Sequence, residues 1–392
     1  MIEKFESKVR ITGIGQSQIG RRLGANPIGL AVDACLAAMA DAGLERSEID
    51  GLSCHPGPLT RDGYSGGGIA DVERVLHVHP RWFNSGHEFA GHTGALVEAA
   101  MAVAAGLARH VIVWRCTWES TAQLRPTASP ASAPLPEIAG DFQWMIPFGA
   151  FSAANWIAPY ANLHMHRYGT TREQLGAIAI NARTNAGHNP AAIYRDPITM
   201  DDYLSARMIS TPFGLYDCDV PCDGATAVIV SAADAARDTR GQSIRIEACG
   251  TQLVEPLSWD NGVLDQMPLA RGAAQSMWER TDLKPADVDV AELYDGFTFN
   301  CLSWLELLGF CSIGEGGAFV EGGQRIALDG ELPLNTHGGQ LSAGRLQGFG
   351  FLHEACVQLR GQGGTRQVRD AQVAVVTTGG GAPGGALLLT RD

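Results

Sequence analysis

Apolar stretches with two different spacings alternate along most of the chain. Residues 8–15 (KVRITGIG) predict a buried strand that leads into a glycine turn. The following segment, NPIGLAVDACLAAMADAGL, places apolar side chains at helical spacing, and Gly43 is a typical residue for the C-terminal cap of that helix. Residues 95–108 predict a second apolar helix, which the β-branched strand His110–Arg115 follows directly. This alternation is typical of an α/β fold with a buried central sheet.

The pattern changes after this strand. Residues 119–149 contain five prolines and show little periodicity, so they predict a long excursion over the surface. Loops of this length in compact domains are commonly lids or binding elements. We therefore predict a loop insertion with the role of a lid at residues 118–165, after which the chain continues as helix.

The chain contains two parts that end in similar patterns. Residues 223–230 (DGATAVIV) predict a hydrophobic strand that closes the first part, and a strand within residues 242–250 opens the second. Residues 371–390 predict two strands around a glycine cluster. A small-residue turn followed by a hydrophobic strand thus ends each part, which indicates an internal duplication. We predict two similar α/β halves packed together, residues 1–241 and residues 242–392.

Composition narrows the class of protein. The 392 residues are 45% hydrophobic and 18% charged, as in a well-buried globular chain. The formal net charge of −13 argues against the basic face that nucleic acid or an anionic membrane requires. No apolar run reaches the ~18–20 residues needed to span a bilayer, so we expect no membrane insertion. The nine cysteines are scattered and the first residues lack the apolar segment of a secretory signal, so we expect a cytoplasmic protein.

Two groups of residues could supply metal ligands, but neither has the spacing or the number of ligands that a metal site needs. His87 and His92 precede a helical run, but they are five residues apart, about 140° around a helix, whereas a zinc-binding helix needs histidines four apart. Cys218 and Cys222 have no second cysteine pair nearby, and a structural zinc site takes about four ligands. We predict no metal site in this chain.

Four glycine-rich turns follow or join predicted strands: residues 91–94 (GHTG), 294–297 (YDGF), 335–339 (NTHGG) and 379–381 (GGG). A turn of small residues can direct backbone N–H groups at a ligand. Together with the GIG strand, the helix ending DAGL and the strand DGATAVIV, their order and rough spacing resemble those of the thiolase superfamily over nearly the whole chain. The resemblance implies the thiolase-like α/β fold, in which two duplicated halves pack together.

The sequence departs from thiolases at the residues of their covalent chemistry. Gly91 stands where the resemblance places the acylated cysteine, and Gly379 stands where it places the second cysteine. Arg345 replaces the catalytic histidine, and Tyr294 begins the turn that contains an asparagine in thiolases. Claisen chemistry needs a thiol nucleophile and a group that moves protons. We therefore expect a reaction that breaks a carbon–carbon bond next to a thioester without covalent catalysis.

Longer segments resemble one branch of the superfamily: NARTNAGHNP, RDPITMDDYLSARMIS, LYDCDVPCDGATAVIV and ELYDGFTFNCLSWLELLGFC. They are similar to thiolase-like lipid-transfer proteins, relatives of the thiolase domain of sterol carrier protein x, and this branch includes bacterial steroid side-chain aldolases. The resemblance implies retro-aldol cleavage of a β-hydroxyacyl-CoA with a bulky, steroidal group, which releases a short acyl-CoA and a ketone or aldehyde. It implies no cofactor in this chain, because CoA enters as part of the substrate.

The resemblance also implies protein partners. Members of this branch work with a small accessory protein that carries an OB-fold and a zinc ribbon, so any zinc would lie in the partner. Thiolase-fold proteins pair through an edge strand of the first half, and we therefore expect a homodimer of this chain within the larger complex.

The resemblance places the proton-transfer residue at Tyr294, and a buried core tyrosine is the alternative interpretation. The pKa of tyrosine, near ~10, would need lowering by a cation. Arg345, which occupies the position of a second tyrosine in some members, is a candidate for that role or for polarising the thioester carbonyl. A salt bridge to a local acid such as Glu354 is the alternative for Arg345. Asp295 either orients Tyr294 or caps the following helix. His337 either lines the pocket or is an ordinary turn histidine.

The predicted site thus has a catalytic and a substrate-binding group. The first contains Tyr294, Arg345, Asp295 and His337, and the second contains Gly91, His92, Gly379, Gly380 and Gly381. Two other functions stay open at this point. One is a catalytically inactive scaffold that binds acyl-CoA or lipid, and the other is an acyltransferase that uses a displaced cysteine such as Cys301 or Cys54.

Overall fold

The computed structural model describes residues 4–55, 63–86, 93–124, 143–253, 270–379 and 384–392. The strands are β1 (Val9–Gln16), β2 (Gly51–Cys54), β3 (Trp82–Ser85), β4 (His110–Trp118), β5 (Met208–Ser210), β6 (Phe213–Gly214), β7 (Asp223–Ala232), β8 (Ile244–Gly250), β9 (Val290–Glu292), β10 (Val373–Thr378) and β11 (Gly385–Arg391). The α-helices are α1 (Pro27–Ala42), α2 (Ile69–Leu76), α3 (Gly94–Ala104), α4 (Glu119–Ala122), α5 (Ala153–Tyr168), α6 (Arg172–Gly187), α7 (Met200–Ser205), α8 (Ala270–Trp278), α9 (Thr298–Leu307), α10 (Gly316–Val320) and α11 (Phe349–Leu359).

Nine of the described strands form one mixed sheet in the order β3-β2-β4-β7-β1-β8-β11-β10-β9. β7 is antiparallel to both of its neighbours, β4 and β1. β1 and β8 join the two parts of the sheet through two residue pairs, Arg10 with Arg245 and Ile11 with Ile244. The strands that precede residue 241 and those that follow it therefore occupy separate parts of the sheet. A domain boundary at this residue stays a prediction.

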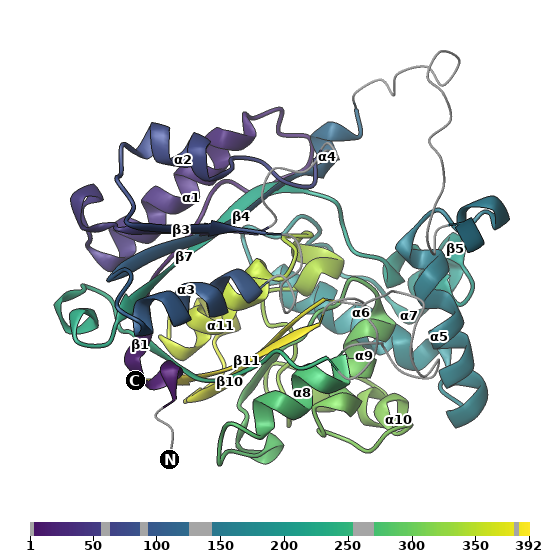
Figure 1. Cartoon of the computed structure of the whole chain (residues 1–392). Coiled ribbons are helices and arrows are strands. Elements are labelled where there is room, and N and C mark those ends of the chain that lie inside the picture. Colours follow the sequence, from purple (N-terminus) through teal and green to yellow (C-terminus); the bar gives the residue numbers. More distant parts are fainter. Residues whose placement is uncertain (1–3, 56–62, 87–92, 125–142, 254–269, 380–383) are drawn as a thin grey trace.

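The helices form layers around the two parts of the sheet (Figure 1). α1 packs on β1, β7 and β4, and α2 contacts α1. α3 and α11 lie between the two parts, since α3 contacts β7, β4 and β2, while α11 contacts β10, β9 and β7. α8 covers β8 and β11 from the other side. This arrangement confirms the predicted α/β fold. No helix within the described ranges is long and apolar enough to cross a membrane.

The contact between β1 and α1 explains the first pattern in the sequence. Asn26 Oδ1 accepts a hydrogen bond from Ile28 N at 3.0 Å at the start of α1, and Gly43, with a φ of 71°, ends the helix as predicted. The glycine turn predicted within residues 8–15 is wrong, because β1 continues through these glycines. An added Cβ at Gly15 would lie 2.3 Å from Ala38 N of α1, so glycine allows the helix to approach the strand.

The loop insertion predicted at residues 118–165 is too long. β4 runs through Trp118, α4 follows it directly, and α5 begins at Ala153. Ser152 N donates to Asn155 Oδ1 at 3.2 Å, so a local capping interaction starts α5 inside the predicted loop. Residues 125–142 lie outside the described residues, and the lid role stays a prediction.

Candidate active site

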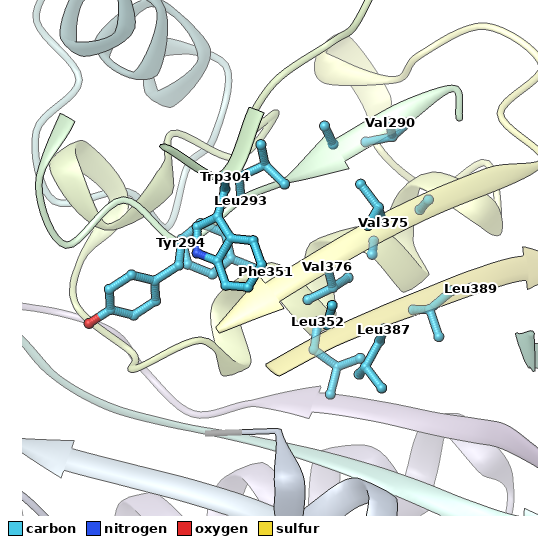
Figure 2. Packing of buried hydrophobic residues seen from close by; sticks show 14 of the residues in the cluster. Val290, Leu293, Tyr294, Trp304, Phe351, Leu352, Val375, Val376, Leu387 and Leu389 are labelled. Atoms are coloured by element: carbon cyan, nitrogen blue, oxygen red, sulfur yellow. The ribbon is translucent and has the colours of Figure 1, made fainter. Parts of the chain in front are cut away.

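Tyr294 lies in the turn between β9 and α9, at the edge of the largest hydrophobic cluster. Its backbone N–H donates to Thr377 Oγ1 of β10 at 2.9 Å. Figure 2 shows the ring directed away from Val375 and Val376, with the hydroxyl at its outer end. An added Cβ at Gly296 would lie 2.7 Å from Cε1 of the tyrosine, so this glycine makes room for the ring. The residue is 8% exposed, so most of its surface is removed from bulk water.

Arg345 is held by two carboxylates, that of the buried Glu119 and that of the partly buried Asp219. Its Nε donates to Glu119 Oε2 at 2.7 Å, and its Nη1 donates to Asp219 Oδ1 at 2.9 Å. Arg345 thus forms a salt bridge, as the alternative interpretation expected, but not with a local acid such as Glu354, which accepts a hydrogen bond from Arg366 Nε at 2.8 Å instead. We call Arg345, Glu119 and Asp219 the arginine–carboxylate cluster. The cluster contains one cation and two carboxylates, so the net charge of the cluster is negative when both carboxylates are ionised.

This cluster does not make Tyr294 more acidic. Burial raises the pKa of Tyr294 above its ordinary value, and the charge of Asp219 adds to that effect, while Arg345 opposes it only in part. Arg345 does lower the pKa of Tyr294, as considered from the sequence, but burial and the charge of Asp219 outweigh this effect, so the pKa is raised overall. Tyr294 is therefore protonated at neutral pH, and it can act as a proton donor. Burial also raises the pKa of Asp219 to about 6, against the opposing effect of Arg345.

Backbone hydrogen bonds connect parts of the site that are distant in the sequence. Asp219 N donates to Gly296 O at 3.1 Å, Val220 N donates to Gln340 O at 2.9 Å, and Arg345 N donates to Val220 O at 2.8 Å. The segment around Asp219 thus lies between the turn that contains Gly296 and the segment that leads to Arg345. The main chain itself fixes this carboxylate beside the tyrosine turn.

Asp295 holds an adjacent turn in place. Its Oδ1 accepts from Gln340 N at 2.7 Å, and its Oδ2 accepts from Asn335 Nδ2 at 3.0 Å. Burial raises the pKa of Asp295 to about 7, although these hydrogen bonds lower it. Asp295 does not cap α9, because both of its oxygens accept from Gln340 and Asn335. At the start of α9, Phe297 N donates to Asn300 Oδ1 at 2.9 Å instead. A catalytic role for Asp295 stays a prediction.

His337 lines a cavity of about 30 Å³, which has room for about one water molecule. Its Nδ1 lies 3.0 Å from Glu292 Oε2 at the end of β9. Burial lowers the pKa of His337, but the interactions with Glu292 and then with Glu354 outweigh burial, so the pKa is raised overall. The rings of His337 and Tyr294 are both near Phe351, with centroid distances of 5.3 Å and 6.3 Å. His337 therefore lines a cavity close to the tyrosine, and a catalytic role stays a prediction.

The described residues of the first and last glycine-rich turns lie close to each other. Thr93 and Thr378 precede α3 and Gly379, respectively, and their Oγ1 atoms are 3.2 Å apart. Gly379 has a φ of +88°, which favours glycine, and its carbonyl accepts from Trp304 Nε1 at 3.2 Å. The other residues predicted to bind substrate lie outside the described residues: Gly91, His92, Gly380 and Gly381.

The two cysteines considered as displaced nucleophiles are poorly suited to that role. Burial raises the pKa of Cys54 to about 12, although Arg115 lowers it, and burial raises the pKa of Cys301 well above its ordinary value. The thiolate is the reactive form of cysteine. Both side chains are therefore unreactive thiols at neutral pH.

Two residues of the site were missed from the sequence, Glu119 and Asp219. Asp219 lies between Cys218 and Cys222, and that motif was interpreted only for its cysteines. A carboxylate in a short segment before a buried strand is the signal that was available. Its pairing with Arg345, 126 residues later, has no trace in local spacing.

Comparisons with known proteins place the chain in a family. The family model described as Thiolase C-terminal domain-like matches residues 263–387. A steroid side-chain-cleaving aldolase from Thermomonospora curvata is 33% identical over 97% of this chain and 97% of its own length. The 17-hydroxy-3-oxo-4-pregnene-20-carboxyl-CoA lyase from Mycobacterium tuberculosis is 34% identical over 98% of this chain and 100% of its own. The chain belongs to this thiolase-like family of aldolases.

The solved structure of an aldolase supports the same family assignment for this chain. The Ltp2-ChsH2(DUF35) aldolase has a TM-score of 0.87 and 32% sequence identity to this chain, and the match covers 98% of both chains. The predicted thiolase-like fold is thus confirmed. The enzyme class is confirmed as well: this chain is a carbon–carbon lyase.

Proposed function

We propose that this aldolase cleaves a β-hydroxyacyl-CoA with a bulky, steroidal group and releases a short acyl-CoA and a ketone or aldehyde. The names of the two full-length relatives support the substrate class, since one is a steroid side-chain-cleaving aldolase and the other is a lyase of a pregnene carboxyl-CoA. CoA enters as part of the substrate, and the proposed reaction needs no further cofactor.

The proposed chemistry is a retro-aldol reaction without an enzyme-bound acyl group. A base takes the proton of the β-hydroxyl, the bond between Cα and Cβ breaks, and Cβ becomes the carbonyl carbon of the released ketone or aldehyde. The electron pair of the broken bond passes into the thioester as an enolate. Protonation of the enolate at Cα gives the short acyl-CoA. Backbone N–H groups in the glycine-rich turns would stabilise the enolate oxygen.

Tyr294 is the residue to which we assign the proton transfer to the enolate. The observation that supports this role is the position of the hydroxyl, at the outer end of a ring against Gly296 and close enough to Asp219 and Arg345 for their charges to affect its pKa. Arg345 is engaged by two carboxylates, so its role is to hold them rather than to polarise the thioester. Asp295 and His337 contribute by fixing the turn and the cavity wall near the tyrosine.

A direct assay tests the proposed function. The purified chain, together with its accessory partner, is incubated with a β-hydroxy steroid-CoA ester, and the short acyl-CoA is quantified. We expect one short acyl-CoA and one steroid ketone or aldehyde for each ester consumed. An inactive acyl-CoA-binding scaffold would bind the ester and release neither product.

The activity should not depend on cysteine. We expect the Cys54→Ser and Cys301→Ser variants to cleave the ester at the wild-type rate, because the reaction has no acyl-cysteine intermediate and both thiols are unreactive. The rate of acyl-CoA release measures this. A variant that folds normally but is inactive would favour an acyltransferase with a displaced nucleophile.

We also propose that the chain functions in a complex with an accessory protein that carries an OB-fold and a zinc ribbon. The name of the Ltp2-ChsH2(DUF35) aldolase, which includes a second component, supports such a partner. Any zinc would then belong to the partner. Co-purification of the two chains from a common expression host tests the complex.

We propose a homodimer of this chain through β3, the strand at one edge of the described sheet. Phe83 of β3 is 65% exposed, which is unusual for a large apolar residue on an edge strand. Phe83→Asp should therefore shift the chain from dimer to monomer in light scattering. Ile313→Asp, at a 40% exposed position far along the chain, serves as the control that keeps the dimer. A dimer that persists in Phe83→Asp would contradict this interface.

A further inference from the structure

We propose that Asp219 is the general base of the cleavage and takes the proton of the substrate's β-hydroxyl. This inference rests on the retro-aldol function proposed above. That reaction needs a base, and Tyr294 is not suited to the role, because its raised pKa keeps the hydroxyl protonated at neutral pH. The cleavage therefore requires a second titratable group next to the tyrosine.

Asp219 is fixed from two directions. Its backbone N–H donates to Gly296 O in the tyrosine turn, and its Oδ1 accepts from Arg345 Nη1 at 2.9 Å. Among the described residues, the structure gives its Oδ2 no hydrogen-bond donor. The side chain is 9% exposed, so this oxygen keeps a lone pair for a substrate proton in surroundings that contain little water.

The other carboxylates near Tyr294 fit the role less well. Glu119 accepts from both Nε and Nη2 of Arg345 at one oxygen, Oε2, and among the described residues no hydrogen bond joins Glu119 to the tyrosine turn. Asp295 uses both of its oxygens to hold its own turn, and it is 0% exposed. Asp219 therefore combines contact with the tyrosine turn and an oxygen that is not used inside the protein.

The electrostatics of the cluster suit a base and an acid that act together. Burial raises the pKa of Asp219 to about 6, Arg345 opposes this, and Glu119 adds to it. Such a carboxylate is ionised at neutral pH, yet it takes a proton more readily than an ordinary aspartate. The same charge helps to keep Tyr294 protonated. The two groups thus hold the protonation states that the reaction needs, one as base and one as acid.

The proposed step balances in protons and electrons. The β-hydroxyl proton moves to Asp219, the electron pair of the Cα–Cβ bond moves to the enolate, and the Tyr294 proton moves to Cα. After product release, the proton on Asp219 returns to the tyrosine, so no external acid, oxidant or reductant is consumed.

The isosteric variant Asp219→Asn tests the base directly. We expect kcat to fall by about 10²–10⁴-fold with little change in KM, because the amide cannot take the proton and the shape of the site is kept. Asp219→Glu should recover part of the rate. Asp41→Asn is the matched control, because Asp41 forms a similar arginine–carboxylate pair with Arg360 at 2.6 Å, and this variant should keep the wild-type kcat.

The pH dependence gives a readout that a merely structural role would not change. In the wild type, kcat should rise with pH around 6, where Asp219 loses its proton, and this acidic limb should be absent from Asp219→Asn. The groups that interact electrostatically with Asp219 are Arg345, Glu119, Tyr294, Cys218 and Asp295. Glu119→Gln should move the limb to lower pH, because removal of the Glu119 charge removes one of the effects that raise the pKa of Asp219.

The outcomes separate the two proposals. If the wild type cleaves the ester while Asp219→Asn keeps its rate and its acidic limb, the assignment of the base is wrong and the proposed function stands. An acidic limb that stays in place in Glu119→Gln would also contradict the assignment. If the wild type releases no acyl-CoA from any β-hydroxyacyl-CoA, the proposed function is wrong and the base assignment falls with it.

Discussion

Replacement of Tyr294 by phenylalanine should lower kcat by about 10²–10⁴-fold, the range typical for loss of a positioned proton-transfer group. Phenylalanine keeps the ring, which fills the space above Gly296 and lies near Phe351, and it removes only the hydroxyl. Substrate binding and folding should therefore change little. The rate of acyl-CoA release at saturating ester measures the effect.

A matched variant separates chemistry from packing. Tyr160 of α5 is another core tyrosine and is 2% exposed, so Tyr160→Phe removes a buried hydroxyl away from the proposed chemistry. We expect this variant to retain the wild-type kcat. Equal rates for Tyr294→Phe and Tyr160→Phe would mean that Tyr294 is an ordinary core tyrosine.

Replacement of Arg345 by methionine should be the most destabilising change in the site. It leaves Glu119 and Asp219 buried without their shared cation, and breaking a buried ion pair from one side typically costs about 3–5 kcal/mol of the free energy of unfolding. Chemical denaturation at neutral pH measures this loss. Arg109→Met is the control, because Arg109 pairs with Asp234 on the surface, where such pairs contribute at most about 1 kcal/mol.

The loss of unfolding free energy caused by Arg345→Met should be smaller at acidic pH. Without the arginine, the pKa of Asp219 in the folded state should lie further above that of the unfolded chain, about 4, because Arg345 no longer opposes the effect of burial. The folded state then binds more protons than the unfolded state, so stability is greatest below the unfolded pKa and falls as pH rises through the folded pKa. Unfolding at about pH 5 and about pH 8 tests this. An equal penalty at both pH values would contradict the assignment of a charged Asp219 at neutral pH.

Helices and strands whose signals lie within a few neighbouring residues could be predicted from the sequence. α1 follows from its apolar spacing and from Gly43 at its end, and β7 follows from the unbroken apolar run after Asp223. Local periodicity and caps act within a few residues, so they are visible in a single sequence. The glycines of β1 were assigned to a turn, because the helix that requires them lies on the strand only in three dimensions.

The electrostatics of the site could not be predicted in the same way. Arg345 binds Glu119, 226 residues away, rather than Glu354, which is nearer in the sequence. The direction of the Tyr294 pKa depends on burial and on the sum of several charges, not on the one cation in a motif position. Residue types thus indicated Tyr294 as the candidate for the proton transfer, whereas the partners that set its protonation required the folded chain.

Cleavage without free CoA distinguishes a retro-aldol enzyme from a thiolase most directly. The purified complex is incubated with a β-hydroxy steroid-CoA ester and no added CoA, and both products are quantified. We expect complete conversion to equal amounts of a short acyl-CoA and a steroid ketone or aldehyde, at the same rate when free CoA is added. Cleavage that starts only after addition of free CoA, with CoA consumed in proportion to product, would contradict a non-covalent aldolase.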